Sequence, residues 1–335
     1  MPIGILGTGA HVPRSTVSNA QIAEWSDVDP GWIVERTGVR ERRYAEPHES
    51  TSSVAEPAAR QAIEAAGGGE VGLIAVATST PDQPQPATAV MLQHRLGLSG
   101  SAAFDLNAVC SGFVYALAAA HAMTSTGSSA GRALVVGADL YSRIMNQRDP
   151  KTVSLFGDAA GAVLLGEVPE GYGVHACVLA AHGEYQDYVG VPAGGTREPL
   201  TPETLRDGRH LFGMDGRAVR DYVMEIIPKI VDQVLADTGW RRDEVDRFVF
   251  HQANARLLGV LAERLGVTPD RTFFTAPHLG NTAAASVPVT LHEMDRARPI
   301  ADGERIVLAS VGGGMTAGAA ALTWHRPAAD GGEAR

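Results

Sequence analysis

Cys110 is the residue whose surroundings most strongly suggest catalysis. It lies in the sequence AVCSGF, between a run typical of a strand and a run typical of a buried helix. The small residues Ala108 and Gly112 flank it, as a sharp strand-to-helix turn requires when a side chain must project from the backbone. A helix N-terminus carries partial positive charge and favours thiolate over thiol. We therefore expect Cys110 to be a nucleophile, with an inert buried cysteine as the alternative.

Three further positions carry groups that a cysteine nucleophile needs, namely a proton handler and donors for developing negative charge. His251 opens the sequence HQAN after a strand-like run, and Asn281 lies in the turn GNTAAAS before a helix. The triplet 312–314 contains only glycine, so its backbone N–H groups are unobstructed donors for an oxyanion. Read separately, these residues also suit a loop histidine, a helix cap and a tight bend.

Other familiar sites are not predicted. The third glycine of a dinucleotide-binding loop would fall at Val12, directly before Pro13, and neither a Walker loop nor a metal-binding motif is present. Cys177 lies in the strand-like HACVLAA with no turn after it, so we interpret it as a core residue. We expect no cofactor and no metal.

The elements that must position these residues alternate between strand and helix, which predicts an α/β fold with helices on both faces of the sheets. Pro228 lies within the longest periodic run and predicts a kink there. Strands are predicted at 73–79, 103–109, 132–139 and 247–250, and helices at 87–97, 112–127, 221–239, 255–266 and 285–297.

An internal repeat indicates two related halves. The run that follows Val71 recurs after Val245, and the run at Arg132 recurs at Arg305, in the same order and with nearly equal spacing. We therefore predict a duplication into residues 1–168 and 169–335, with chance similarity of short apolar strands as the alternative.

Taken together, AVCSGF, HQAN, GNTAAAS and the glycine triplet resemble the β-ketoacyl-acyl-carrier-protein synthase III family of the thiolase-like superfamily. The similarity runs from DPGWIVERTGVRERR through FGDAAGAVL to the end of the chain. It implies a five-layered αβαβα fold of two duplicated halves. It also implies a homodimer that uses acyl-CoA and malonyl-acyl carrier protein (malonyl-ACP) as substrates.

The resemblance also implies roles for the residues. Cys110 would take the acyl group from acyl-CoA as a thioester. His251 and Asn281 would stabilise the charge that forms when malonyl-ACP loses carbon dioxide. The backbone N–H groups of Cys110 and Gly313 would form the oxyanion hole of the condensation, which yields 3-oxoacyl-ACP in fatty acid or polyketide biosynthesis.

The substrate-binding residues come from the same resemblance. Trp32 and Arg36 match a motif that holds CoA, and Arg256 matches a basic residue implicated in docking of the acidic carrier protein. Arg217 and Arg220 either join that basic patch or are ordinary solvated charges on a helix.

Some positions depart from the family pattern. The segment 79–90 has no aromatic residue, and its largest side chains are Gln83 and Gln85; Ala317 stands where the family usually has tryptophan, and Arg220 lies near a typically apolar tunnel position. These changes call a plain acetyl-CoA preference into question, and we infer a specialised paralogue that primes or extends a polyketide. The alternative function is acyl transfer to an oxygen or nitrogen nucleophile, with His251 as the general base.

Composition limits the partners and the compartment. A net charge of −10 argues against nucleic acid or an anionic membrane as a partner. Two cysteines are too few for a disulfide framework, and neither a leader nor a membrane span is visible. We therefore expect a cytoplasmic enzyme.

Overall fold

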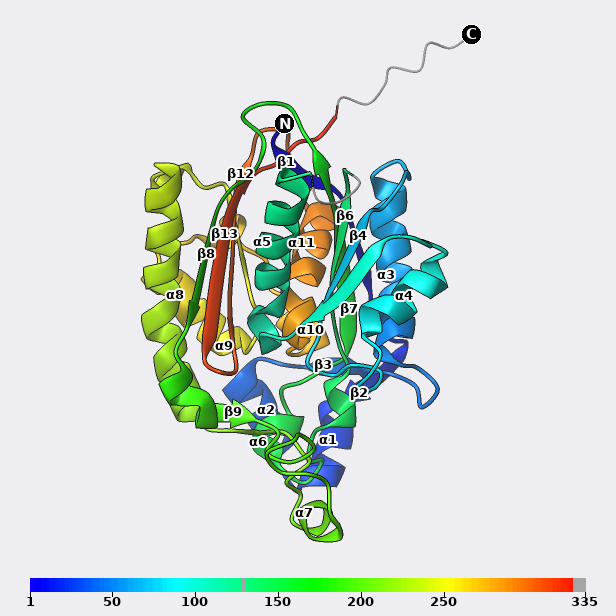
Figure 1. Cartoon of the computed structure of the whole chain (residues 1–335). Helices are drawn as coiled ribbons and strands as arrows, with labels where there is room; N and C mark the ends of the chain where they lie inside the picture. Colours follow the sequence, from blue (N-terminus) through cyan, green and yellow to red (C-terminus); the bar gives the residue numbers. More distant parts are fainter. Residues whose placement is uncertain (128–130, 328–335) are drawn as a thin grey trace.

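The computed structural model describes residues 1–127 and 131–327 and forms five layers, αβαβα (Figure 1). The two large sheets face each other across a layer of helices, and further helices cover both outer faces. This is the architecture that the resemblance implied, so the fold prediction is confirmed.

The first sheet has five strands in the order β1-β7-β6-β4-β5. β6 pairs parallel with β4, and β4 parallel with β5, whereas β7 runs antiparallel to both β1 and β6. Every residue of β4 is buried, as the unbroken apolar run predicts for a strand covered on both faces. The bounds are β1 Ile3–His11, β4 Leu73–Ala77, β5 Ala102–Leu106, β6 Ala133–Asp139 and β7 Ala159–Glu167.

The second sheet has four strands in the order β11-β12-β13-β8. β11 pairs parallel with β12, and the other two pairs are antiparallel. A parallel bridge between Phe248 and Thr272 extends its open edge by one residue pair. The bounds are β8 Gly173–Ala181, β11 Arg247–Phe250, β12 Arg305–Gly312 and β13 Thr316–Thr323.

Within the described part of the chain, six helices make up the three helical layers. The central pair, α5 Gly112–Ser125 and α11 Ser286–Ala297, contacts both sheets and shares one hydrophobic core with them. α3 Thr51–Ala65 and α4 Thr88–Leu96 cover the outer face of the first sheet. α8 Gly216–Thr238 and α9 Ala255–Arg264 pack on the outer face of the second. Alanine-rich α5 suits the central layer because small side chains let both sheets approach.

Short elements gather at one end of the layers, at the bottom of Figure 1. One of these elements is the helix α2, Pro30–Thr37, which carries Trp32 and Arg36, two residues predicted to bind substrate. That helix begins where Asp29 accepts a hydrogen bond from Trp32 N and ends at Gly38 in the left-handed conformation. The elements are α1 Asn19–Ser26, α2 Pro30–Thr37, α6 Pro150–Val153, α7 Pro202–Arg206, α10 Ala276–Leu279, β2 Ser15–Ser18, β3 Glu41–Tyr44, β9 Val189–Gly190 and β10 Gly213–Met214.

Three helix boundaries differ from the predictions by two residues or more. α5 ends at Ser125 instead of 127. α8 begins at Gly216 instead of 221, because Asp215 accepts hydrogen bonds from Arg217 N and Ala218 N and so caps an earlier start. α9 ends at Arg264 instead of 266. Pro228 lies inside α8, and the kink there stays a prediction.

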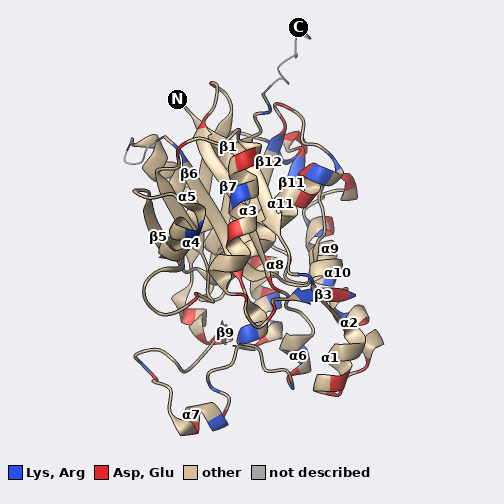
Figure 2. Ribbon diagram, turned by 90° about the vertical axis from the view of Figure 1, so that its right-hand side faces the viewer, with Lys and Arg blue, Asp and Glu red and all other residues tan. Residues whose placement is uncertain are grey.

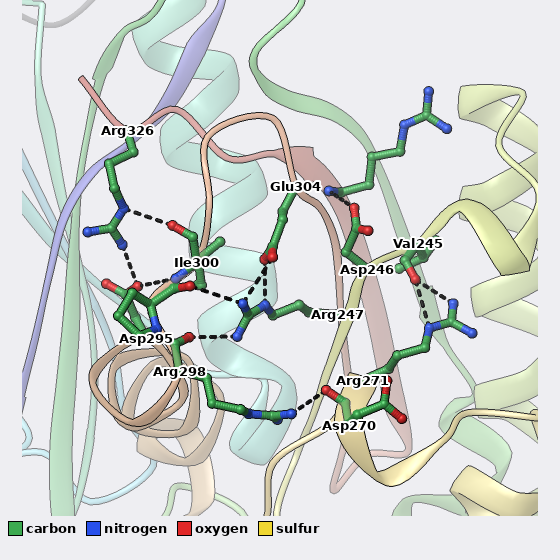
Figure 3. Close-up of polar contacts among 12 residues, drawn as sticks. Val245, Asp246, Arg247, Asp270, Arg271, Asp295, Arg298, Ile300, Glu304 and Arg326 are labelled. Atoms are coloured by element: carbon green, nitrogen blue, oxygen red, sulfur yellow. Dashed lines mark hydrogen bonds and ion pairs between the residues drawn. The ribbon is translucent and has the colours of Figure 1, made fainter. Parts of the chain in front are cut away.

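A polar network closes the second sheet at the end where β11 and β12 begin (Figure 3). Arg247 pairs with Glu304 and donates to the carbonyl of Arg298, and Arg326 pairs with Asp295. His251 follows the opposite end of β11, so this network is remote from the candidate site. Within the described residues, no helix combines the length and apolarity that crossing a membrane requires.

Candidate active site

One cavity of about 820 Å³ brings together the residues that the sequence singled out for chemistry. Cys110, His251, Asn281 and Gly313 all line it, although they come from four separate segments of the chain. Cys110 follows β5, His251 follows β11, Asn281 precedes α11 and Gly313 lies in the β12–β13 turn. Trp32 and Arg36 line the same cavity.

Cys110 lies in a strained turn between β5 and α5. Val109 has φ +50°, which is unusual for a β-branched residue and typical of strain stored at functional sites. A 3-10 turn, Val109–Ser111, separates the strand from α5. Ser310 Oγ donates to the carbonyl of Cys110 over 2.8 Å, which ties this turn to β12 of the second sheet.

The Cys110 thiol is not the stabilised thiolate that its place before a helix predicted. Burial, and secondly the nearby Asp139 carboxylate, raise the pKa of the Cys110 thiol above its ordinary value. Cys110 lies within the 3-10 turn Val109–Ser111, just before α5 begins at Gly112, so it is outside the first turn of that helix. Loss of solvation therefore outweighs the helix dipole, and the free enzyme holds a neutral thiol.

His251 is buried and neutral. Burial lowers its pKa to about 3 from the ordinary 6.5. Its Nδ1 lies 2.5 Å from Ser286 Oγ at the start of α11. No described protein group is hydrogen-bonded to the other ring nitrogen, Nε2, and the ring lines the cavity.

Asn281 has a fixed amide orientation. Its Oδ1 accepts a hydrogen bond from Ala283 N over 2.9 Å, so the oxygen is identified and the NH2 group is left for the cavity. Its backbone is held as well, because its N–H donates to Leu155 O and its carbonyl accepts from Gly157 N. Asn281 therefore presents a donor on a rigid support.

The glycine triplet packs directly against the Cys110 turn. A Cβ at Gly312 would lie 2.9 Å from Cys110 N and 2.8 Å from Ser111 N, so no other residue fits there. This contact places the backbone of Gly313 beside the nucleophile.

Basic residues surround the entrance of the cavity. Arg36, Lys151, Arg217 and Arg220 line it and are exposed to solvent. Arg256 does not line it, but it lies at the start of α9, where Asn254 Nδ2 donates to Arg36 O over 3.2 Å. Arg256 is thus a rim residue. Sequence reasoning missed Lys151.

An aromatic cluster that the sequence analysis also missed packs beside Cys110. Tyr141 and Phe156 stack with ring centroids 4.4 Å apart, and Phe212 meets both rings edge-on. All three belong to the hydrophobic cluster that contains Cys110. By contrast, Gln83 and Gln85 are exposed and do not line the cavity of their own chain.

The remaining candidates are structural. Cys177 is partly buried in β8 and packs against the central core, as expected. Among residues 1–127 and 131–327, no group of three or more histidine, cysteine, aspartate and glutamate side chains is arranged to hold a metal ion.

The family models that match this chain carry the descriptions 3-oxoacyl-[acyl-carrier-protein (ACP)] synthase III, over residues 104–183, and the C-terminal part of the same enzyme, over residues 235–324. Acetoacetyl CoA synthase NphT7 of Streptomyces sp. (strain CL190) is 45% identical over 96% of this chain and 98% of its own. β-Ketoacyl-[acyl-carrier-protein] synthase III of Symbiobacterium thermophilum is 41% identical over 97% and 99%.

Solved structures agree with this. The 3-oxoacyl-(acyl carrier protein) synthase III of Pseudomonas aeruginosa PAO1 superposes with a TM-score of 0.90 at 35% identity, over 98% of this chain and 100% of the other. The priming β-ketosynthase of the R1128 polyketide pathway gives 0.89 at 30% identity, over 98% and 97%. The chain therefore belongs to the 3-oxoacyl-[acyl-carrier-protein] synthase III family of acyltransferases.

Proposed function

We propose that this chain catalyses decarboxylative Claisen condensation of an acyl group, carried on Cys110, with a malonyl thioester. The observation that carries the proposal is a pair of neutral donors facing the nucleophile's cavity. These are the Asn281 amide NH2, whose oxygen is held by Ala283 N, and the ring of His251, which burial keeps uncharged. Neutral donors suit an oxyanion that forms only during the reaction.

In the first half-reaction, Cys110 Sγ attacks the thioester carbonyl of acyl-CoA. The bond to CoA sulfur breaks, and the thiol proton leaves with CoA as its free thiol, so atoms and charge balance. The backbone N–H groups of Cys110 and Gly313 are the proposed donors to the tetrahedral oxyanion, supported by the close packing of Gly312 on this turn. Trp32 and Arg36 at the entrance are the proposed contacts for CoA.

In the second half-reaction, the malonyl carboxylate leaves as carbon dioxide and its electron pair forms an enolate. His251 and Asn281 stabilise the enolate oxygen, and the enolate carbon attacks the acyl thioester on Cys110. Collapse of the second oxyanion releases the 3-oxoacyl thioester and the Cys110 thiolate, which takes up one proton.

The malonyl group arrives on an acyl carrier protein in this proposal. The exposed arginines around the entrance, with Arg256 on the rim, give a local positive field for an acidic carrier despite the net charge of −10. CoA is the second candidate carrier, because a relative 45% identical to this chain is named acetoacetyl CoA synthase. That relative and the polyketide-priming structure also support a specialised paralogue.

A second copy of the chain completes the proposed enzyme. Among the described strands, β5 is an edge strand that pairs only with β4, and its own sequence, AAFDL, contains neither lysine nor proline (Figure 2). Phe104 and Leu106 on it are only partly buried. We therefore propose that two chains join along β5.

We also propose a cytoplasmic location. The free cysteines Cys110 and Cys177 suit a reducing cytoplasm.

The test is intact mass spectrometry after incubation with acyl-CoAs from acetyl to octanoyl, followed by malonyl-ACP or malonyl-CoA with carbon dioxide measured. We expect wild type to gain one acyl mass, most readily with the short acyl groups that fit beside Tyr141 and Phe156. Cys110→Ala should gain none, and Cys177→Ala should behave as wild type. Native spectra should show two chains. Acylation of Cys110→Ala, or an acylated enzyme that releases no carbon dioxide from either malonyl thioester, would contradict the proposal.

A further inference from the structure

Ser286 is a buried hydroxyl that the reaction as described does not use. It is the first residue of α11, is 0% exposed, and lies 35 positions from the histidine it contacts. Two groups converge on its Oγ. His251 Nδ1 lies at 2.5 Å, and Gln252 N donates from 3.4 Å.

These two contacts decide which ring nitrogen of His251 carries the proton. Gln252 N–H is always a donor, so Ser286 Oγ is its acceptor and the hydroxyl hydrogen must point elsewhere. Among the described residues, His251 Nδ1 is the other polar atom within hydrogen-bonding distance of Ser286 Oγ, so we infer that it accepts that hydrogen. If Nδ1 carried the proton instead, two N–H groups would meet one oxygen, and a buried hydroxyl hydrogen would be left without an acceptor.

We propose that Ser286 is a positioning residue that holds His251 in the tautomer with its proton on Nε2. This inference rests on the proposed function and deepens it. Nε2 then donates into the cavity toward the oxygen of the forming enolate, in concert with the Asn281 amide. The same tautomer has no free lone pair on Nε2, so His251 does not serve there as a base for an alcohol or amine. The hydroxyl of Ser286 thereby favours condensation over acyl transfer to oxygen or nitrogen.

Two features of the surroundings make the device stable. His251 N donates to Ala309 O over 2.9 Å, which anchors the ring's backbone to β12. The side chain of Gln252 donates to Phe250 O and accepts from Thr275 N, which fixes the backbone that supplies the N–H to Ser286. The geometry around Oγ therefore does not depend on substrate.

The kinetic test separates the two half-reactions. In Ser286→Ala, we expect carbon dioxide release from the malonyl thioester to fall by about 10- to 100-fold, since a tautomer mixture weakens one oxyanion donor. Acylation of Cys110 should stay within about threefold of wild type, because His251 takes no part in it. Ser286→Thr keeps the hydroxyl and should restore much of the decarboxylation.

The matched control is Thr290→Val, one turn further along α11. It also removes a buried hydroxyl, which contacts Thr275 Oγ1 at 2.9 Å and not His251, so both half-reactions should be retained. Equal loss of acylation and decarboxylation in Ser286→Ala, or equal loss in Thr290→Val, would overturn the proposal in favour of general damage to the helix.

A spectroscopic readout works without turnover. Two-bond proton–nitrogen correlation of 15N-histidine-labelled enzyme, with His251 assigned by its absence in His251→Gln, should show the Nε2–H pattern in wild type. Ser286→Ala should shift this toward the Nδ1–H tautomer. Wild-type signals of the Nδ1–H form would overturn the inference. Should wild type release no carbon dioxide, the proposed function fails, and this spectrum still decides the role of Ser286.

Discussion

At the scale of single residues, the site is built from groups that are uncharged at rest. Burial raises the pKa of the Cys110 thiol and lowers that of His251, so neither group holds a charge that the cavity must solvate before substrate arrives. Asp139 is the acidic neighbour, and six described hydrogen-bond donors from Thr78, Ser79, Thr80 and Ala284 reach one or other of its oxygens. Negative charge therefore develops in the site mainly during the reaction, on the oxyanions that the hydrogen-bond donors stabilise.

The buried state of His251 predicts a pH dependence of stability. The folded-state pKa of His251, about 3, lies below the ordinary 6.5. Between these two pH values, the imidazole is therefore protonated in the unfolded chain and neutral in the folded chain. Stability from this residue is complete above about pH 6.5 and is lost as pH falls, by about 2 kcal/mol at pH 5. We expect urea unfolding at pH 7.5 and 5 to show a smaller acid loss in His251→Ala than in wild type. Replacement of the exposed His94 by alanine should leave the loss unchanged. If wild type and His251→Ala lost equal unfolding free energy between pH 7.5 and 5, the predicted contribution of His251 would be wrong.

The sequence revealed the residues whose types carry chemistry, and it missed those that act through long-range contacts. Cys110, His251 and Asn281 stand in short motifs beside turns, so their spacing is readable. Ser286 reaches His251 only because α11 packs beside β11. Tyr141 joins the cluster beside Cys110 by packing against Phe156 and Phe212, which are distant from it in the sequence.

At the scale of elements, the position of Asn281 depends on a close contact between strand β6 and the turn that follows Asn281. Gly137 in β6 lies against the backbone of Ala284, in the 3-10 turn Ala283–Ala285 that joins Asn281 to α11. Ala283 has φ +48°, and Ala284 N donates to Asp139 Oδ2 over 3.0 Å. The first sheet thus shapes the turn that presents the Asn281 amide.

This contact predicts a strong effect of Gly137→Ala. The new Cβ would lie 2.9 Å from the carbonyl carbon of Ala284. Because both contacting groups belong to the backbone and cannot move easily, we expect the free energy of unfolding to fall by more than about 2 kcal/mol. Decarboxylation should suffer more than acylation in the protein that folds, because Asn281 moves with the turn. Gly259→Ala is the matched control. Gly259 lies in α9 with open space around it, so a gain of about 0.5–1 kcal/mol in urea unfolding is expected. A neutral Gly137→Ala would refute the argument.

Periodicity located most helices and strands, while their ends depended on caps. The helix at 112–127 and the strand at 247–250 agree closely with α5 and β11. The predicted start of α8 was late because Asp215 was not recognised as a cap. Sheet order was not predictable from local pattern, since pairing such as β1 with β7 joins segments more than 140 residues apart.

At the scale of the whole molecule, we propose that residues 1–168 and 169–335 are copies of one unit. The order β1-β7-β6-β4 corresponds to β8-β13-β12-β11, and the Phe248–Thr272 bridge stands where β5 would lie. The turns Val109–Ser111 and Ala283–Ala285 both begin with a residue at positive φ and both lead into a central helix. Cys110 and the turn after Asn281 would then occupy equivalent places in the two halves. This explains why the site lies where the two halves meet.

Net charge has little influence on such a site. On the side shown in Figure 2, acidic and basic residues are interspersed, as with Glu56, Arg60 and Glu64 along α3. An excess of ten negative charges spread in this way leaves room for a local basic entrance. The arrangement of arginines near the cavity therefore matters more for a carrier protein than the sum does.

Although the described residues form two large sheets, the shared central layer predicts that the chain unfolds as one unit. α5 and α11 belong to a core that includes residues of both sheets, so neither half can lose its structure without exposing the other. Leu134 lies in the separate outer core of the first sheet, whereas Trp324 packs into the central core. Leu134→Ala should cost about 2–5 kcal/mol. With the other tryptophans replaced by phenylalanine, the urea midpoint from Trp324 fluorescence should fall together with the midpoint from circular dichroism. A Trp324 midpoint that stays in place while circular dichroism splits into two transitions would mean that the halves unfold independently, and that the central layer does not couple them.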